Sequence, residues 1–136
     1  MMFVQTMSLA ISITNLGDTS LLKCVGRITL GEGSVVLRDT VRDALVGGAK
    51  NIVLDLSDVS YMDSSGIGEL VSAFTTTRNS GGNLVLTSLT KRVSDLLQIT
   101  KLYTVFETFE TVDAAVEFLK PGSVSKERDE SEIQES

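Results

Sequence analysis

The chain has 136 residues, of which 42% are hydrophobic and 5% aromatic, and a formal net charge of -6. That length fits one domain with a mainly aliphatic core. The acidic balance argues against a nucleic-acid-binding role and against direct binding to an anionic membrane surface, since both need a basic face. Histidine is absent, which excludes a Ser-His-Asp triad, a histidine-ligated metal and histidine acid-base chemistry.

The single cysteine, Cys24, cannot form an internal disulfide and lies in an apolar stretch. It is predicted to be a buried, reduced thiol in a reducing compartment. One cysteine also excludes a thiolate zinc site within one chain. Residues 1–10 lack the charged start and long apolar run of a signal peptide, and no stretch of about 18 apolar residues could span a membrane. We therefore expect a cytoplasmic protein with no metal and no cofactor.

The N-terminal half predicts a hairpin, a helix and a buried strand, in that order. Residues 9–14 alternate apolar and polar, and residues 20–28 form a second strand after a turn rich in Asn, Gly and Asp. Apolar residues between 36 and 45 recur at helical spacing, and Gly47-Gly48 ends that helix. Residues 51–56 form a short apolar run, which is typical of a central strand.

The C-terminal half continues the alternation. A helix begins at Asp63 or Ser64 as its N-cap, and its apolar face repeats from Ile67 to Phe74. The remaining elements are predicted as a strand at 84–86, a helix at 93–100, a strand at 105–109 and a last helix at 111–119.

This order predicts an α/β fold. Strand-helix-strand units with short links favour a mixed, mostly parallel sheet of about five strands with about four α-helices. The domain is expected to cover residues 8–120. Residues 121–136 contain five acidic and two basic residues with almost nothing apolar, so they are predicted to be a disordered acidic tail.

The segment Asp63-Ser64-Ser65-Gly66-Ile67-Gly68 follows a buried strand and opens an amphipathic helix. In an open α/β sheet, ligands and partners dock at the carboxyl ends of strands. Two glycines near a helix start cost about 1 kcal/mol each relative to alanine, which indicates a close approach to the backbone. A simple helix cap is the plainer interpretation. The spacing and lysine of a phosphate-binding loop are missing, as are the preceding glycine and the base of a hydrolase elbow.

The run from Leu54 to Gly68, LDLSDVSYMDSSGIG, resembles the signature of STAS domains, in particular of bacterial anti-sigma factor antagonists. The resemblance extends to residues 81–86 and 93–102 and covers about residues 8–120. It implies that Ser64, the serine directly after the aspartate, is phosphorylated by a partner kinase that is itself the anti-sigma factor. It further implies that the unphosphorylated protein, a monomer or weak dimer, binds this kinase and releases the sigma factor. A phosphatase of the PP2C type would then reverse the phosphorylation.

A phosphate on Ser64 would add about -1.5 to -2 charges, and a helix N-terminus tolerates an anion. We therefore expect phosphorylation to block an interface without melting a helix. Asp63 is predicted either to orient the Ser64 hydroxyl and contact the kinase or simply to cap the helix. Ser65 is predicted to be structural, and Gly66 and Gly68 to keep the docking surface flat. The predicted partner-binding residues are Arg27, Thr29, Asp63, Ser64, Ser65, Gly66, Ile67 and Gly68.

One segment departs from the family pattern. Many members carry an aspartate where this chain has Thr29, in Gly26-Arg27-Ile28-Thr29. The loop commonly neighbours the phosphorylated serine, so Thr29 bears on which partner is bound. Arg27 is either a solvated strand end or a charge partner for an acidic surface. A second functional hypothesis is a STAS scaffold or ligand-binding subunit of a lipid or anion transport complex. An enzyme, such as a nucleotide hydrolase, is disfavoured because histidine, a metal cluster and a phosphate loop are missing.

Overall fold

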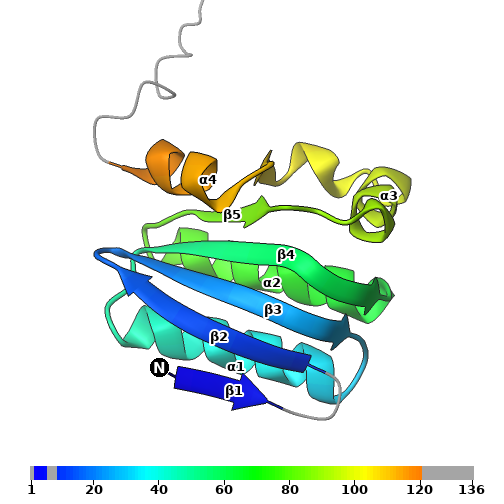
Figure 1. Ribbon diagram of the computed structural model, residues 1–136, viewed down its shortest axis with the longest axis horizontal. Coiled ribbons are helices and arrows are strands. Elements are labelled where there is room, and N and C mark those ends of the chain that lie inside the picture. The colour runs from blue at the N-terminus through cyan, green and yellow to red at the C-terminus, as the bar shows by residue number, and fades with distance from the viewer. Residues whose placement is uncertain (1, 6–8, 121–136) are drawn as a thin grey trace, which may run out of the picture.

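The computed structural model describes residues 2–5 and 9–120, which form a six-stranded mixed sheet with helices on both faces (Figure 1). The strands lie in chain order across the sheet: β1 (Met2–Gln5), β2 (Leu9–Leu16), β3 (Thr19–Ile28), β4 (Asn51–Met62), β5 (Leu84–Thr87) and β6 (Glu107–Phe109). The first three pair antiparallel, and the pairs from β3 to β6 are parallel.

Of the four helices, the first three connect the parallel strands, as the strand-helix-strand pattern requires, and the last follows β6. They are α1 (Glu32–Val46), α2 (Ser64–Asn79), α3 (Lys91–Ile99) and α4 (Val112–Leu119), with a short 3-10 helix, η1, at Leu102–Thr104. The predicted α/β class, mixed sheet and four helices are confirmed. The predicted acidic tail, residues 121–136, lies outside the described residues.

Two features of the sheet were not predicted. Strand β1 adds an edge to the sheet by pairing with β2, from Met2 opposite Ile13 to Gln5 opposite Ala10. Strand β4 continues six residues beyond the predicted apolar run and ends at Met62. Its second half exposes Ser57 and Asp58, and its pairing with β3 contains two register shifts. This extension takes β4 to the end of the sheet at which the parallel strands have their carboxyl ends, and the Asp63 segment begins there.

The main core lies between the sheet and the helices α1, α2 and α3. Its fully buried side chains include Leu22 of β3, Leu54 of β4 and Leu70 of α2, and each such leucine stabilises the fold by about 1.5–3 kcal/mol. On the opposite face, α4 packs Ala115 against Val53 and Val85. Figure 1 shows no described helix in front of β2 and β3 on that face.

Candidate functional site

Helix α2 begins directly where β4 ends. Asp63 has extended backbone geometry and is the N-cap, and its Oδ1 accepts a hydrogen bond from the backbone N–H of Gly66 at 3.0 Å. A carboxylate at this position satisfies an N–H group that has no partner inside the helix, and its charge suits the positive end of the helix dipole. The sequence left the cap open between Asp63 and Ser64, and the structure assigns it to Asp63.

The second carboxylate oxygen of Asp63 reaches another element. Its Oδ2 accepts a hydrogen bond from the backbone N–H of Leu30 at 3.3 Å, in the loop between β3 and α1. The same loop is held on its other side by the N–H of Ser34, which donates to the carbonyl of Thr29 at 3.1 Å. One side chain thus joins the start of α2 to the loop that contains Thr29, so the structure brings these two predicted site residues together.

Ser64 is the first residue of α2, and its side chain is exposed. Within the described residues, no group forms a hydrogen bond with its hydroxyl, and Asp63 directs both carboxylate oxygens to backbone N–H groups. The structure therefore supports the capping interpretation of Asp63. The hydroxyl of Ser64 is therefore accessible from solvent. Ser65 is half-buried, and its hydroxyl likewise forms no hydrogen bond among residues 9–120.

Gly66 has a different role from the one predicted. It is buried, and a Cβ added there would lie 2.6 Å from Cγ of Met62 and nearer still to the carbonyl oxygen of Ile28. Its lack of a side chain lets α2 pack against the end of β3, so the prediction that Gly66 keeps an exposed surface flat is wrong. Gly68 is exposed, and a Cβ there would meet nothing within 4 Å.

Ile67 is 5% exposed and belongs to the main core. The helical periodicity placed it on the inner face of α2, and that prediction is confirmed. Its predicted contact with a partner is not compatible with this burial. The accessible part of the motif consists of Ser64 and Gly68, with Asp63 and Ser65 half-buried on either side of Ser64.

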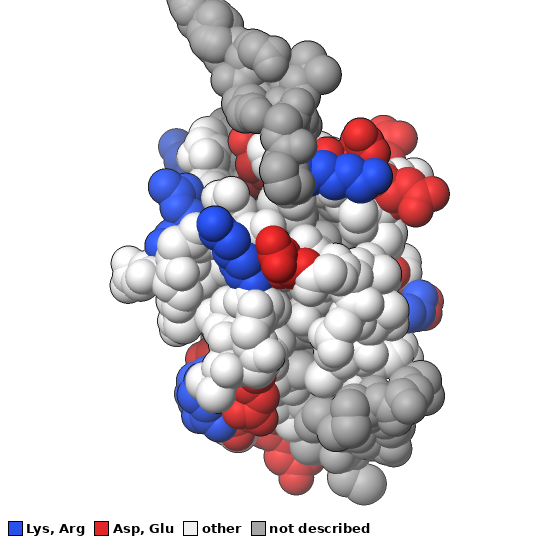
Figure 2. Space-filling model, turned by 90° about the vertical axis from the view of Figure 1, so that its left-hand side faces the viewer, with Lys and Arg blue, Asp and Glu red and all other residues white. Residues whose placement is uncertain are grey.

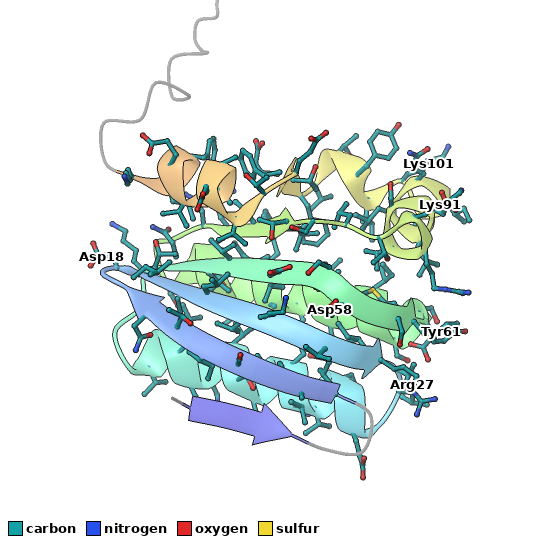
Figure 3. The ribbon with its side chains drawn as sticks, in the orientation of Figure 1. Asp18, Arg27, Asp58, Tyr61, Lys91 and Lys101 are labelled. Atoms are coloured by element: carbon teal, nitrogen blue, oxygen red, sulfur yellow. The ribbon has the colours of Figure 1, made fainter. Side chains whose placement is uncertain are left out.

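Sequence reasoning missed an exposed aromatic residue at the same edge. Tyr61 is 41% exposed, and the guanidinium carbon of Arg92 lies 4.9 Å from its ring centroid. Arg27 is the register partner of Tyr61 on the neighbouring strand, and Figure 3 shows Arg27, Tyr61 and Lys91 at the same end of the sheet. The only sequence signal was an aromatic residue two positions before the capping aspartate. Leu30, 78% exposed in the neighbouring loop, was also missed.

The perturbed titratable groups lie away from this edge. Burial raises the pKa of the Cys24 thiol to about 12, with the charge of Asp55 adding to the shift, and the predicted burial of Cys24 is confirmed. A hydrogen bond with Asp58 and the charge of Asp55 raise the pKa of Lys23. These carboxylates lie 3.2 and 3.8 Å from the Lys23 ammonium. The three charged side chains form a structural ion-pair group on β3 and β4.

Two further surveys concern residues 2–5 and 9–120 only. No three His, Cys, Asp or Glu side chains gather there in a way that could hold a metal ion. None of the described helices has the length and apolar character that crossing a membrane requires.

Comparisons with known proteins place the motif in a family. The family model described as STAS domain matches residues 10–115. The anti-sigma-B factor antagonist of Bacillus subtilis (strain 168) is 36% identical over 80 residues, which are 57% of this chain and 73% of that protein.

Solved structures show the same fold. The unphosphorylated form of the anti-sigma factor antagonist SpoIIAA has a TM-score of 0.68 and 19% identity, over 79% of this chain and 93% of that chain. The phosphorylated form of SpoIIAA, from Bacillus, has a TM-score of 0.65 and 17% identity, over 81% of this chain and 99% of that chain.

Proposed function

This chain belongs to the STAS domain family, and we propose that it is an anti-sigma factor antagonist whose binding to a kinase-type anti-sigma factor is switched by phosphorylation of Ser64. The observation that carries the proposal is the geometry of Ser64. Its hydroxyl is exposed on the first residue of α2, at the carboxyl edge of the sheet, next to a carboxylate that is fully used in holding the surrounding backbone.

A phosphate on Ser64 is compatible with the fold. Helix α2 has 16 residues, and the free N–H groups and dipole at its start favour an added anion. The cap of Asp63 does not depend on the Ser64 hydroxyl, so the helix start can stay intact. SpoIIAA shares this fold in both its unphosphorylated and its phosphorylated form, which supports a switch that acts without unfolding.

The same phosphate opposes a bound partner. It would add about -1.5 to -2 charges beside the carboxylate of Asp63, and a partner covering this edge would have to remove water from both groups. The β3–α1 loop contributes Thr29 in place of a carboxylate, so the unmodified surface carries less negative charge than the common family pattern. The proposed contact surface comprises Asp63, Ser64, Ser65 and Gly68, with Arg27 and Thr29 at its rim.

The remaining parts of the proposal follow from the switch. A phosphatase of the PP2C type returns Ser64 to the binding form, and the protein works in the cytoplasm, where the sigma factor is. It acts as a binding protein, not as an enzyme, and does so as a monomer or weak dimer. The domain responsible covers residues 8–120, and the acidic segment 121–136 follows it.

Affinity capture from the native cells tests the proposal. The bait proteins are the wild type, Ser64→Ala, Ser64→Asp and, as a matched control, Ser72→Ala, which changes another exposed serine of α2. We expect a kinase-type anti-sigma factor with every bait except Ser64→Asp, and mass spectrometry should find phosphate on Ser64 of the wild type. An unmodified Ser64 together with transporter subunits on all four baits would overturn the proposal in favour of the transport-complex scaffold.

A further inference from the structure

Helix α3 carries apolar side chains on a face that no described residue covers. Val93 and Leu97 hold the helix to the core, whereas Ile99 is 76% exposed and Leu96 only partly buried. Arg92, Leu96 and Ile99 are spaced four and three residues apart, so they share one face of the helix. A surface helix of a small domain ordinarily places polar residues on its outer face, so the exposed apolar residues here indicate a contact surface.

Tyr61 extends this face to the switch. Its ring lies under the guanidinium of Arg92, and it precedes Ser64 by three residues at the end of β4. We name Tyr61, Arg92, Leu96 and Ile99 together the outer α3 surface. A shallow hollow of about 400 Å3 lies on it, lined by Lys91, Arg92, Asp95, Leu96 and Ile99. The hollow offers space for one or two apolar side chains of a partner.

The charges of this surface favour an acidic partner. Lys91 is paired with Asp95 at 3.0 Å, but neither Arg92 nor Arg27 forms an ion pair with any described residue. The Tyr61 ring holds the Arg92 guanidinium in place, so little side-chain entropy is lost when a carboxylate binds it. Figure 2 views the opposite end of the sheet, where both basic and acidic side chains are exposed.

We propose that the outer α3 surface is the second half of the anti-sigma factor interface and receives an acidic, partly apolar segment of that protein. An apolar side chain enters the hollow beside Leu96 and Ile99, and a carboxylate pairs with Arg92. Tyr61 connects the outer α3 surface to the proposed contact surface around Ser64, so one partner can cover both surfaces. This inference rests on the proposed function and adds to it where the partner lies and which chemistry it presents.

Photo-crosslinking in native cells tests the inference. The Ser64→Ala protein carries p-benzoyl-phenylalanine in place of Leu30, Ile99 or Val46. All three are exposed aliphatic positions, where substitution changes stability little. Leu30 reports on the Ser64 edge and Ile99 on the outer α3 surface. Val46, 81% exposed at the end of α1, is the control. We expect the same anti-sigma factor on Leu30 and Ile99, and none on Val46.

The other possible crosslinking results distinguish failure of the outer α3 surface from failure of the proposed function. Crosslinks to the anti-sigma factor from Leu30 alone would overturn the outer α3 surface and leave the proposed function standing. A second copy of this chain, or a different protein, on Ile99 would overturn it as well. An anti-sigma factor at neither position would overturn both proposals.

Titration of the captured anti-sigma factor then tests the chemistry. Arg92→Glu and Ile99→Asp should each raise Kd at least about tenfold, as expected for central contacts of an interface, while Val46→Asp should leave it unchanged. The effect of Arg92→Glu should shrink at high salt, because an exposed ion pair is screened. Wild-type affinity in both variants would contradict the inference.

Discussion

The packing of Gly66 against the end of β3 gives a prediction about stability. In Gly66→Ala, the new Cβ would lie 2.6 Å from Cγ of Met62 and closer still to the carbonyl oxygen of Ile28. The side chain of Met62 can adjust, but the carbonyl belongs to the end of β3, so α2 and β3 must separate. Overpacking of this kind costs about 3 kcal/mol at the upper end of its usual range. The better helix propensity of alanine returns roughly 1 kcal/mol.

The expected net loss is therefore about 2 kcal/mol, which lowers the melting temperature by roughly 8 °C in a domain of this size. Gly68→Ala is the matched control, because its Cβ would meet nothing within 4 Å in the same helix. It should raise the unfolding free energy by about 0.5–1 kcal/mol. Thermal melts followed by circular dichroism measure both. If Gly66→Ala melted at or above the wild-type temperature, the assignment of Gly66 to the α2–β3 contact would be refuted.

Three further predictions concern other parts of the molecule. Asp63→Ala removes the acceptors for the N–H groups of Gly66 and Leu30 and should lower the unfolding free energy, measured with urea, by about 1–3 kcal/mol. An unchanged urea midpoint would contradict the stabilising role of these two hydrogen bonds. Cys24 should resist a thiol reagent at pH 8 until the protein unfolds. Because the thiol loses its proton at its usual pKa of 9.0 when unfolded but near 12 when folded, the unfolding free energy should fall as pH rises through that window; Cys24→Ala should show a smaller decline, to which Lys23, whose pKa is also raised in the folded protein, still contributes. Phe106→Ala should cost about 3–5 kcal/mol, because the ring is buried and packs edge-on against Phe74 at 5.4 Å, whereas Tyr103→Ala at an exposed position should change little.

Local patterns predicted most of the fold. The alternating residues 9–14 lie on β2 of the structure, and the apolar residues 51–56 lie on β4. The sequence also restricted the N-cap of α2 to two neighbouring residues, Asp63 and Ser64. Strand β1 escaped prediction because four residues without flanking turn signals carry too little pattern. Its pairing with β2 is decided by the finished sheet.

The candidate site was predicted in position but not in detail. Helical periodicity correctly placed Ile67 on the inner face of α2, yet every residue of the motif, Ile67 included, was predicted to contact the partner. Which of two glycines packs against β3 depends on how α2 lies on the sheet, and the spacing of Gly66 and Gly68 does not contain that information. The contact between Tyr61 and Arg92 joins residues far apart in the chain, so only the packing of α3 beside β4 reveals it.

The central claim is that phosphate on Ser64 blocks a partner while the fold stays intact. The most direct measurement is a calorimetric titration of the purified anti-sigma factor with two forms of this protein, one unmodified and one with phosphoserine incorporated at position 64. We predict binding by the unmodified form and an affinity at least tenfold lower, about 1.4 kcal/mol or more, for the phosphorylated form. Equal affinity of the two forms would contradict the account.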